Sequence, residues 1–357
     1  RDLHPRVRRQ RQMCIRDRIN TVDAIGHVLC HDITRIIKDE VKDTPFRKGH
    51  IVKEEDIPVL LSLGKEHLYV WEQKEDMLHE NDAAKILYSL CENEYMHPSA
   101  IREGKIEVIG EVDGMLDVDV ERLCDINETE EIMIASRSNY SLVKKGEKLA
   151  GMRVIPLMVS KAKMEEVKQK AKDKPLLAIR PFILKTAGVV TTGSEVYHGR
   201  IKDTFTPVII DKLKEYGIEV CMHMIVDDKP EQITEAIRTM KEAKIDMILC
   251  TGGMSVDPDD VTPLSIRLSG ANIVSYGAPV LPGAMFLLGY FEDDTPIVGL
   301  PGCVMYAKAT VFDLCLPRIA CGIKLTKKDI ARLGNGGFCM QCKKCHYPNC
   351  SFGKEIL

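Results

Sequence analysis

The chain has few aromatic residues and no strong excess of charge of either sign. Phe, Trp and Tyr make up 5% of its 357 residues, and the formal net charge at pH 7 is −3. Binding of nucleic acid by base stacking needs aromatic side chains, and binding by bulk charge needs a basic surplus. The composition therefore indicates a protein that does not bind nucleic acid.

Long apolar segments are also missing. No window of about 18 apolar residues occurs, which argues against a transmembrane helix, and we find no apolar signal segment. We therefore expect a cytoplasmic protein that does not contact membranes and whose thiols are reduced. Hydrophobic residues make up 45% of the chain, which is enough for globular cores, and its length predicts two or three domains.

Residues 1–18 differ in composition from the rest. They contain seven arginines and two acids, so the remainder has 43 basic and 51 acidic residues and a net charge of −8. A basic arm or a targeting peptide is one interpretation, but the segment lacks the serine content and amphipathic pattern of a transit peptide. The stretch from Arg9 to Arg18 resembles translated adaptor sequence, so we expect a non-native leader.

Two blocks of mixed elements follow, at 19–74 and 75–173. The first should contain a helix from Asp56 to Leu63, stopped by Gly64, and then a strand from Leu68 to Trp71. The second should contain a helix at 82–90, strands at 106–112, 132–136 and 150–159, and a charged, solvent-exposed connecting helix at 161–172.

The third block, residues 174–325, alternates predicted strands and helices. Strands are expected at 176–190, 218–226, 245–250 and 295–299. Helices are expected at 204–216, 228–243, 264–268 and 303–319. This alternation predicts an α/β domain of three layers with a mostly parallel sheet, preceded by smaller mixed α+β/β domains.

Three glycine-containing loops of the third block should meet at one edge of its sheet. They run from Thr191 to Arg200, from Thr251 to Pro263 and from Gly299 to Cys303. Glycine turns expose backbone N–H groups and helix N-termini carry partial positive charge, so phosphate is the expected ligand. The alternative for the acidic middle loop is an ordinary solvated connection.

Carboxylates in and near these loops offer oxygen ligands for Mg²⁺, which proteins bind with few carboxylates plus substrate phosphate. They are Glu195, Asp227, Asp228, Asp259 and Asp260. Asp228 also has a structural interpretation, because Asp228, Pro230 and Glu231 form the pattern of a helix N-terminus. For Glu195 the alternative is a surface position, and His198 is expected to be a polar loop residue.

The motifs of the third block resemble, in order and spacing, the molybdopterin-binding domain of molybdopterin molybdotransferases and adenylyltransferases. The matching segments are Thr192 to Val196, Val226 to Asp228, Thr251 to Val256 with Asp260, Pro282–Gly283, and Gly299 to Gly302. The two preceding blocks resemble more weakly the amino-terminal region of the molybdotransferase, through Asp23 to Leu29.

The resemblance implies Mg-dependent insertion of molybdate into adenylated molybdopterin with release of AMP. It implies catalytic roles for Glu195, Asp228 and Asp260, with Glu195 and Asp260 holding Mg²⁺ or the phosphates. It also implies pterin or phosphate binding by Thr192, Gly193, Ser194, Gly252, Gly253, Ser255, Pro282, Gly283, Pro301 and Gly302. Members of the family form dimers, so we expect a homodimer, with a molybdoenzyme or another cofactor-synthesis protein as a candidate partner.

The chain also departs from the molybdotransferase pattern. Leu281 and Ala284 flank Pro282–Gly283 where the family carries lysines suited to an oxyanion, and Cys303 stands where the family has Asn. These departures favour an alternative function, a non-catalytic molybdopterin-binding carrier or chaperone that delivers or senses the cofactor. Candidates for the missing positive charge are Arg47, Lys48 and Arg153.

Four of the 13 cysteines lie close together in the tail, residues 326–357. They are Cys339, Cys342, Cys345 and Cys350. Four thiols at this spacing are typical of an all-thiolate site for zinc or an iron–sulfur cluster, and His346 is an alternative ligand. We expect zinc rather than iron–sulfur, and a role in contact or redox sensing. The alternative is a reduced tail without metal, and the other nine cysteines are expected to be scattered, mostly buried thiols.

Overall fold

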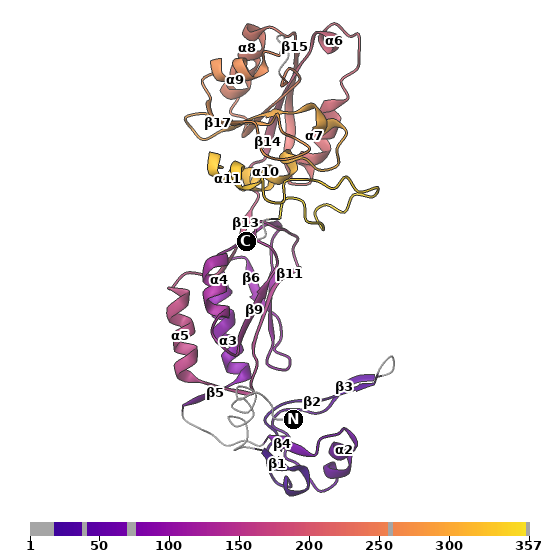
Figure 1. The fold of residues 1–357 in the computed structure, drawn as a ribbon, viewed down its shortest axis with the longest axis vertical. Helices are drawn as coiled ribbons and strands as arrows, with labels where there is room; N and C mark the ends of the chain where they lie inside the picture. The colour runs from indigo at the N-terminus through magenta and orange to yellow at the C-terminus, as the bar shows by residue number, and fades with distance from the viewer. Residues whose placement is uncertain (1–17, 38–40, 70–75, 256–259, 355–357) are drawn as a thin grey trace, which may run out of the picture. The chain divides into compact units, whose positions relative to one another are not determined.

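The computed structural model describes residues 18–37, 41–69, 76–255 and 260–354, which form two compact units (Figure 1). Unit 1 contains residues 1–109, 118–137 and 148–178. Unit 2 contains residues 110–117, 138–147 and 179–357. The two short segments 110–117 and 138–147 therefore belong with the carboxyl-terminal unit, which no sequence pattern indicated.

The first part of unit 1 consists of two antiparallel strand pairs around a small core. The pairs are β1 (Arg18–Asn20) with β4 (His67–Tyr69), and β2 (Ile33–Ile37) with β3 (Val41–Phe46). Helix α2 (Asp56–Ser62) confirms the predicted helix, and Gly64 follows it with a φ of +73°. Leu29, Leu60 and Leu68 are buried in the core, which the 3-10 helix η1 (Thr21–Asp23) borders.

The second part of unit 1 combines a four-stranded sheet with three helices. The sheet order is β6 (Met96–Pro98), β7 (Ile106–Gly110), β11 (Lys148–Val154), β9 (Ile132–Ser136). The other elements are β5 (Met77–His79), which pairs with β12 (Met158–Ser160), and helices α3 (Glu80–Cys91), α4 (Val120–Asn127) and α5 (Lys161–Ala171). The prediction of an exposed connecting helix was wrong. Helix α5 packs on α3 and α4 and buries Met164, Val167 and Ala171.

Unit 2 is built around a six-stranded sheet. Its order is β15 (Glu219–Val226), β14 (Thr186–Thr192), β16 (Met247–Thr251), β19 (Pro296–Leu300), β18 (Leu287–Tyr290), β17 (Asn272–Tyr276). The first four strands are parallel, and β18 runs antiparallel to both of its neighbours, β19 and β17. The predicted α/β class with a mostly parallel sheet is confirmed, although β18 and β17 were not predicted.

Helices cover both faces of this sheet (Figure 1). Those of one face are α7 (Phe205–Lys214), α10 (Val311–Ala320) and α11 (Lys327–Arg332), and those of the other are α8 (Pro230–Glu242) and α9 (Thr262–Leu268). Because side chains alternate along a strand, Val189 packs with the first group and Val190 with the second. The three predicted layers follow from this alternation of buried residues.

Three further elements complete unit 2. They are β8 (Gly114–Val118), β10 (Leu142–Val143) and β13 (Leu177–Pro181). The prediction of one strand over 176–190 was wrong, because β13 ends before β14 begins. None of the helices in the described ranges has the length and apolar character that a bilayer-spanning helix needs.

The predicted helix over 303–319 is also interrupted. The 3-10 helix η2 (Gly302–Met305) ends before α10 begins. Thr310 and Asp313 form a capping box at the start of α10, in which Asp313 accepts from the Thr310 backbone N–H at 2.7 Å. Because this cap satisfies the first N–H groups of α10, it fixes a new helix start.

The cysteine-containing tail is anchored to the core of unit 2. Phe352 is 4% exposed within that core, and the Tyr347 hydroxyl donates to the backbone oxygen of Asp313 at 2.9 Å. Leu281 and Phe338 form an isolated β-bridge, with the Cys339 N–H donating to Leu281 O. The tail therefore packs beside the loop that contains Pro282 and Gly283.

Candidate functional site

The four parallel strands of unit 2 end at one edge of the sheet. The register pairs Thr192 of β14 with Val226 of β15, and Thr251 of β16 with Leu300 of β19. The loops that follow these strands lie next to one another, as expected for parallel strands, and this edge is where open α/β sheets bind ligands.

A turn formed by Gly252 and Gly253 is the most constrained part of this edge. Their φ angles are +85° and +54°, and a Cβ atom on Gly252 would lie 2.3 Å from the Thr192 backbone oxygen. A Cβ atom on Gly253 would lie 2.8 Å from Thr262 Oγ1, which is itself 3.2 Å from Thr192 Oγ1. Only glycine fits both the conformation and the space at these two positions.

This turn leaves hydrogen-bond donors available. The Thr251–Leu300 pairing of the parallel strands engages the Gly252 N–H with Leu300 O, because Pro301 has no N–H to donate. The next two backbone N–H groups, of Gly253 and Met254, donate to no residue in the described ranges. Consecutive unengaged N–H groups in a turn form a concavity that attracts anions. The arrangement can therefore bind a phosphate group of a ligand.

Ser194 joins the ends of β14 and β15. Its backbone N–H donates to Asp228 Oδ2 at 2.7 Å, and its hydroxyl donates to Asp227 Oδ1 at 2.6 Å. The bond from Ser194 and the ion pair with Lys229 lower the pKa of Asp227 to about 2. Ser194 is the first residue of the short helix α6 (Ser194–Tyr197). Asp227 and Asp228 therefore hold the start of this helix at the ends of β14 and β15.

The helix-cap interpretation of Asp228 was wrong. Lys229 is the N-cap residue of α8 and makes no side-chain capping bond. The carboxylate of Asp228 instead accepts from Ser194 on the neighbouring strand end. The proline and glutamate at the start of α8 are sufficient to give the helix-start pattern without this contact.

Tyr276, at the end of β17, holds the glycine-containing loop from the other side. Its hydroxyl is 3.1 Å from Met254 O and 3.3 Å from Ser255 O. Burial and then the charge of Asp260 raise the pKa of Tyr276. One signal for Tyr276 was its position as an aromatic residue directly before Gly277, but β17 itself was not predicted. Asp257 and Asp259 lie outside the described residues.

Four further residues were predicted to bind the ligand: Pro282, Gly283, Pro301 and Gly302. They lie at the same edge of the sheet, but their hydrogen bonds in the described part of the chain do not involve Ser194 or the glycine turn. Gly283 approaches the start of α10, where a Cβ atom would lie 2.5 Å from Val311 Cγ1, and Pro282 O accepts from Val311 N–H at 3.2 Å. Pro301 and Gly302 lead into η2. Within the described ranges no hydrogen bond joins these four residues to Ser194 or to the glycine turn.

The predicted metal ligands do not form a closed site. No group of three or more His, Cys, Asp and Glu side chains in the described part of the chain is placed to hold a metal ion. Glu195 and Asp260 therefore fit Mg²⁺ only together with oxygen atoms of a substrate. In the tail, Cys339 and Cys350 are half-buried, and Cys342 and Cys345 are exposed. The magnesium and zinc sites stay predictions.

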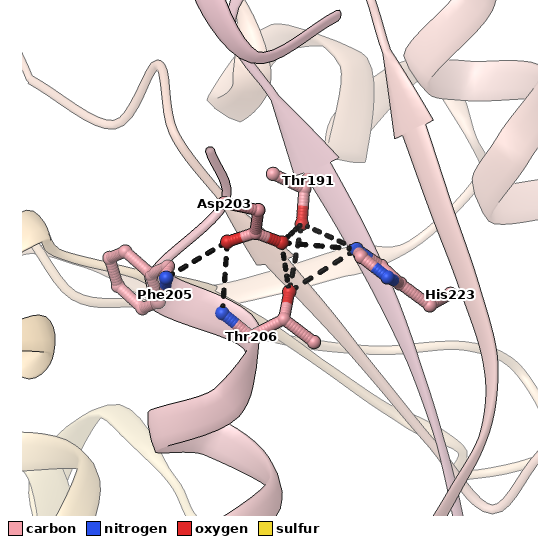
Figure 2. A network of polar contacts seen from close by, with 5 residues as sticks. All are labelled: Thr191, Asp203, Phe205, Thr206 and His223. Carbon is pink, nitrogen blue, oxygen red and sulfur yellow. Dashed lines mark hydrogen bonds and ion pairs between the residues drawn. The ribbon is translucent and has the colours of Figure 1, made fainter. Parts of the chain in front are cut away.

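A polar network lies behind the end of β14, on the α7 side (Figure 2). Thr191 Oγ1 is 2.9 Å from His223 Nε2 and 3.1 Å from Thr206 Oγ1, and Thr206 Oγ1 donates to Asp203 Oδ2 at 2.6 Å. Asp203 also accepts from the backbone N–H groups of Phe205 and Thr206 at 2.8 and 3.1 Å.

This network fixes the start of α7 against β14 and β15. Burial by itself raises the pKa of Asp203, but the hydrogen bonds from Thr206 and Phe205 outweigh it and lower the pKa. Asp203 and His223 were not among the predicted site residues. The signal for Asp203 was an acid two residues before a helix, whereas His223 lies within a strand and gave none.

Comparison with known families identifies two regions of the chain. Residues 188–320 match the profile of the family described as "Probable molybdopterin binding domain", which spans unit 2 from β14 to α10. Residues 18–72 match a family described as "Domain of unknown function (DUF8806)". The domain-family resemblance of the third block is therefore supported, and the amino-terminal block corresponds to a family without a described function.

Curated relatives match a short segment. A CinA-like protein of Mycobacterium tuberculosis is 41% identical over 76 residues, covering 21% of this chain and 18% of the relative. A CinA-like protein of Mycobacterium avium is 38% identical over 89 residues, covering 25% and 20%. The chain thus spans about a fifth of the length of these relatives.

Solved structures give weak matches. The molybdopterin biosynthesis Mog protein of Mycobacterium ulcerans is 20% identical, with a TM-score of 0.34, and covers 39% of this chain and 99% of its own. The protein CinA of Thermoplasma acidophilum is 19% identical, with a TM-score of 0.33, and covers 38% and 98%. At these scores the matches carry no argument about function.

Proposed function

We propose that unit 2 binds a molybdopterin-type ligand by its phosphate and that the protein acts in molybdenum cofactor biosynthesis. The observation that carries this proposal is the pair of consecutive unengaged N–H groups at Gly253 and Met254, directly after β16. The family match over 188–320 supports a pterin as the rest of the ligand. Tyr276 and Thr262 hold the turn in a conformation suited to an anion.

The more specific proposal is insertion of molybdate into adenylated molybdopterin with release of AMP. In this proposal Glu195 and Asp260 lie near the phosphate. Support comes from the position of Glu195 directly after Ser194 at the strand end, and from the influence of the Asp260 charge on Tyr276. Both carboxylates are then ligands to Mg²⁺ together with substrate oxygens, and the metal supplies neutralisation of charge on the leaving phosphate. The glycine turn positions the phosphate that leaves.

The second candidate function is a non-catalytic molybdopterin carrier. Two observations favour it. Asp227 and Asp228 are engaged with Ser194, which removes two carboxylates from the set available to a metal. Leu281 and Ala284 supply no positive charge beside Gly283. A protein with this arrangement holds the pterin phosphate without a dedicated group for the molybdate oxyanion.

One assay separates the two functions. The full chain is incubated with adenylated molybdopterin, Mg²⁺ and molybdate, and AMP is measured by chromatography. Release of AMP that Asp260→Asn reduces at least about tenfold supports the enzyme. Asp211→Asn, a change at an exposed acid of α7, is the matched control and should retain turnover. Pterin binding without AMP release removes the enzyme proposal and leaves the carrier.

A homodimer, a cytoplasmic location and zinc in the tail are further proposals. The zinc proposal is tested on the full chain by metal analysis after purification without added metal, in the wild type and in Cys342→Ser. A loss of bound zinc in the variant supports an all-thiolate site. Equal metal content in the two proteins contradicts it. Light scattering of the same preparation determines the oligomeric state.

A further inference from the structure

A large polar cavity lies within unit 1 and is lined by residues of that unit alone. Its volume is about 1080 Å³, which is in the range of pockets that accept whole small molecules. Its walls come from three parts of the chain, around the β2–β3 hairpin, the 99–107 segment and β11. Charged side chains dominate the walls, with both signs present.

The acids of this cavity already have partners. Glu107 pairs with Lys105 at 2.7 Å and with Lys148 at 2.6 Å, and Asp43 pairs with Arg35 at 2.5 Å. These contacts lower the pKa values of Glu107 and Asp43, so both are ionised and neutralised. The negative charge on this part of the wall is therefore compensated.

The other two acids of the wall, Asp32 and Glu103, accept hydrogen bonds from uncharged donors. Asp32 accepts from the Lys48 backbone N–H at 2.7 Å, and Glu103 accepts from the Thr34 hydroxyl at 2.6 Å. No acid of the cavity wall is therefore paired with either of two arginines of the same wall, Arg47 and Arg102.

Unlike the acids, two arginines of the cavity wall have side chains without a hydrogen-bond or ion-pair partner in the described ranges. The guanidinium groups of Arg47 and Arg102 make no hydrogen bond or ion pair with any residue in the described part of the chain. Arg153 has one long ion pair, 3.8 Å from Glu80, and a 3.3 Å bond to Val154 O. Three guanidinium groups thus face one cavity with most of their donors unused.

The backbone holds one of these arginines in place. Arg102 and Lys105 form an isolated antiparallel bridge around a tight turn, in which Glu103 and Gly104 have φ angles of +50° and +69°. A Cβ atom on Gly104 would lie 2.5 Å from Glu80 Cδ, so the turn packs closely on α3. Arg102, which is exposed, is therefore held by a turn that packs on α3.

We infer that this cavity is a binding site for a small, multiply charged oxyanion, with Arg47, Arg102 and Arg153 as its recognition groups. A guanidinium group donates two parallel hydrogen bonds to a phosphate or a carboxylate. Three such groups around a polar cavity favour a ligand with at least two negative charges. A phosphorylated compound and a polycarboxylate share this chemistry, and experiment distinguishes them.

The test is hydrogen–deuterium exchange of the full chain with inorganic pyrophosphate and, separately, with citrate. With a ligand at about millimolar concentration, peptides covering 43–49 and 99–107 should exchange more slowly. Protection by pyrophosphate alone assigns a phosphorylated ligand, and protection by citrate alone assigns a polycarboxylate. A phosphate bound at the proposed site of unit 2 would instead protect 251–255, so the two sites are distinguished.

The variants localise the effect to the arginines. Arg47→Gln and Arg102→Gln should each weaken binding of the anion about tenfold, because each removes a charge-assisted hydrogen bond. The affinity of Arg47→Lys should lie between that of Arg47→Gln and that of the wild type, because lysine keeps the charge but not the paired donors. Arg332→Gln, an exposed arginine of α11, is the matched control and should bind normally. Absence of protection at 43–49 and 99–107 with both anions, or equal protection in the double glutamine variant, overturns the inference.

Discussion

The two units present hydrogen-bond donors to a ligand in different ways. In unit 2 the donors are the backbone N–H groups of Gly253 and Met254 in the glycine turn, and in unit 1 they are the side chains of Arg47 and Arg102. A backbone site depends on residues whose conformation only glycine adopts without strain. A side-chain site depends on residues that the fold brings together from distant parts of the chain.

This difference predicts different costs of mutation. Removing the unit 2 site should damage the fold, because the turn packs against Thr192 and Thr262. Removing the unit 1 site should affect binding alone, because the guanidinium groups of Arg47 and Arg102 make no hydrogen bond or ion pair with other residues in the described ranges. Four measurements test this contrast.

The largest effect is expected for Gly252→Ala. The new Cβ atom would lie 2.3 Å from the Thr192 backbone oxygen at a φ of +85°, so the free energy of unfolding should fall by about 2 kcal/mol or more. Urea unfolding of the full chain measures this. Gly302→Ala is the matched control, because a Cβ atom there meets nothing within 4 Å. Equal stability of the two variants would contradict the account of the turn.

Substitution of both cavity arginines by glutamine should weaken oxyanion binding strongly but change the unfolding free energy by less than about 0.5 kcal/mol. Thermal unfolding without ligand measures the second quantity. A loss of stability comparable to that of Gly252→Ala would show that these arginines are structural, and the contrast between the units would fail.

Tyr276→Phe tests the support of the glycine turn. The variant leaves the acceptors Met254 O and Ser255 O without the hydroxyl, so we expect a loss of about 1 kcal/mol in stability and weaker ligand binding. Tyr306→Phe is the control, since Tyr306 is 75% exposed. If both substitutions leave pterin affinity unchanged, Tyr276 does not position the turn.

The smallest effect concerns Asp227 and acid pH. The pKa of Asp227 is about 2, below its ordinary value of 3.8, so its stabilising contribution is fully present above about pH 4. It is lost as the pH falls through about 2. The stability difference between wild type and Ser194→Ala should therefore shrink between pH 4 and pH 2, as measured by urea unfolding. A difference that is constant over this range would exclude a role for the Ser194–Asp227 bond.

The sequence predicted the parts of unit 2 that depend on local patterns. The strand–helix alternation predicted the parallel strands, and the glycines of residues 251–253 predicted a tight turn at a strand end. It did not predict β17 and β18, whose strands are antiparallel and carry no intervening helix. Tyr276 was missed for the same reason, since its contact with Met254 joins segments that are distant along the chain.

Unit 1 was harder to predict because its features depend on tertiary packing. The lysine-rich helix at 161–172 has few apolar residues, yet Met164 and Val167 are completely buried against neighbouring helices. Arg47 and Arg153 were candidates for an anion site from charge alone, but nothing in the sequence placed them in one cavity. Arg102 was not a candidate, because its role follows from the fold.

The most direct test of the central claim is binding of adenylated molybdopterin to the full chain, followed by hydrogen–deuterium exchange. The account predicts saturable binding, with slower exchange in peptides covering 192–195 and 251–255, because the ligand phosphate accepts from the N–H groups of the glycine turn. Absence of binding, or binding that leaves exchange at 251–255 unchanged, would contradict it.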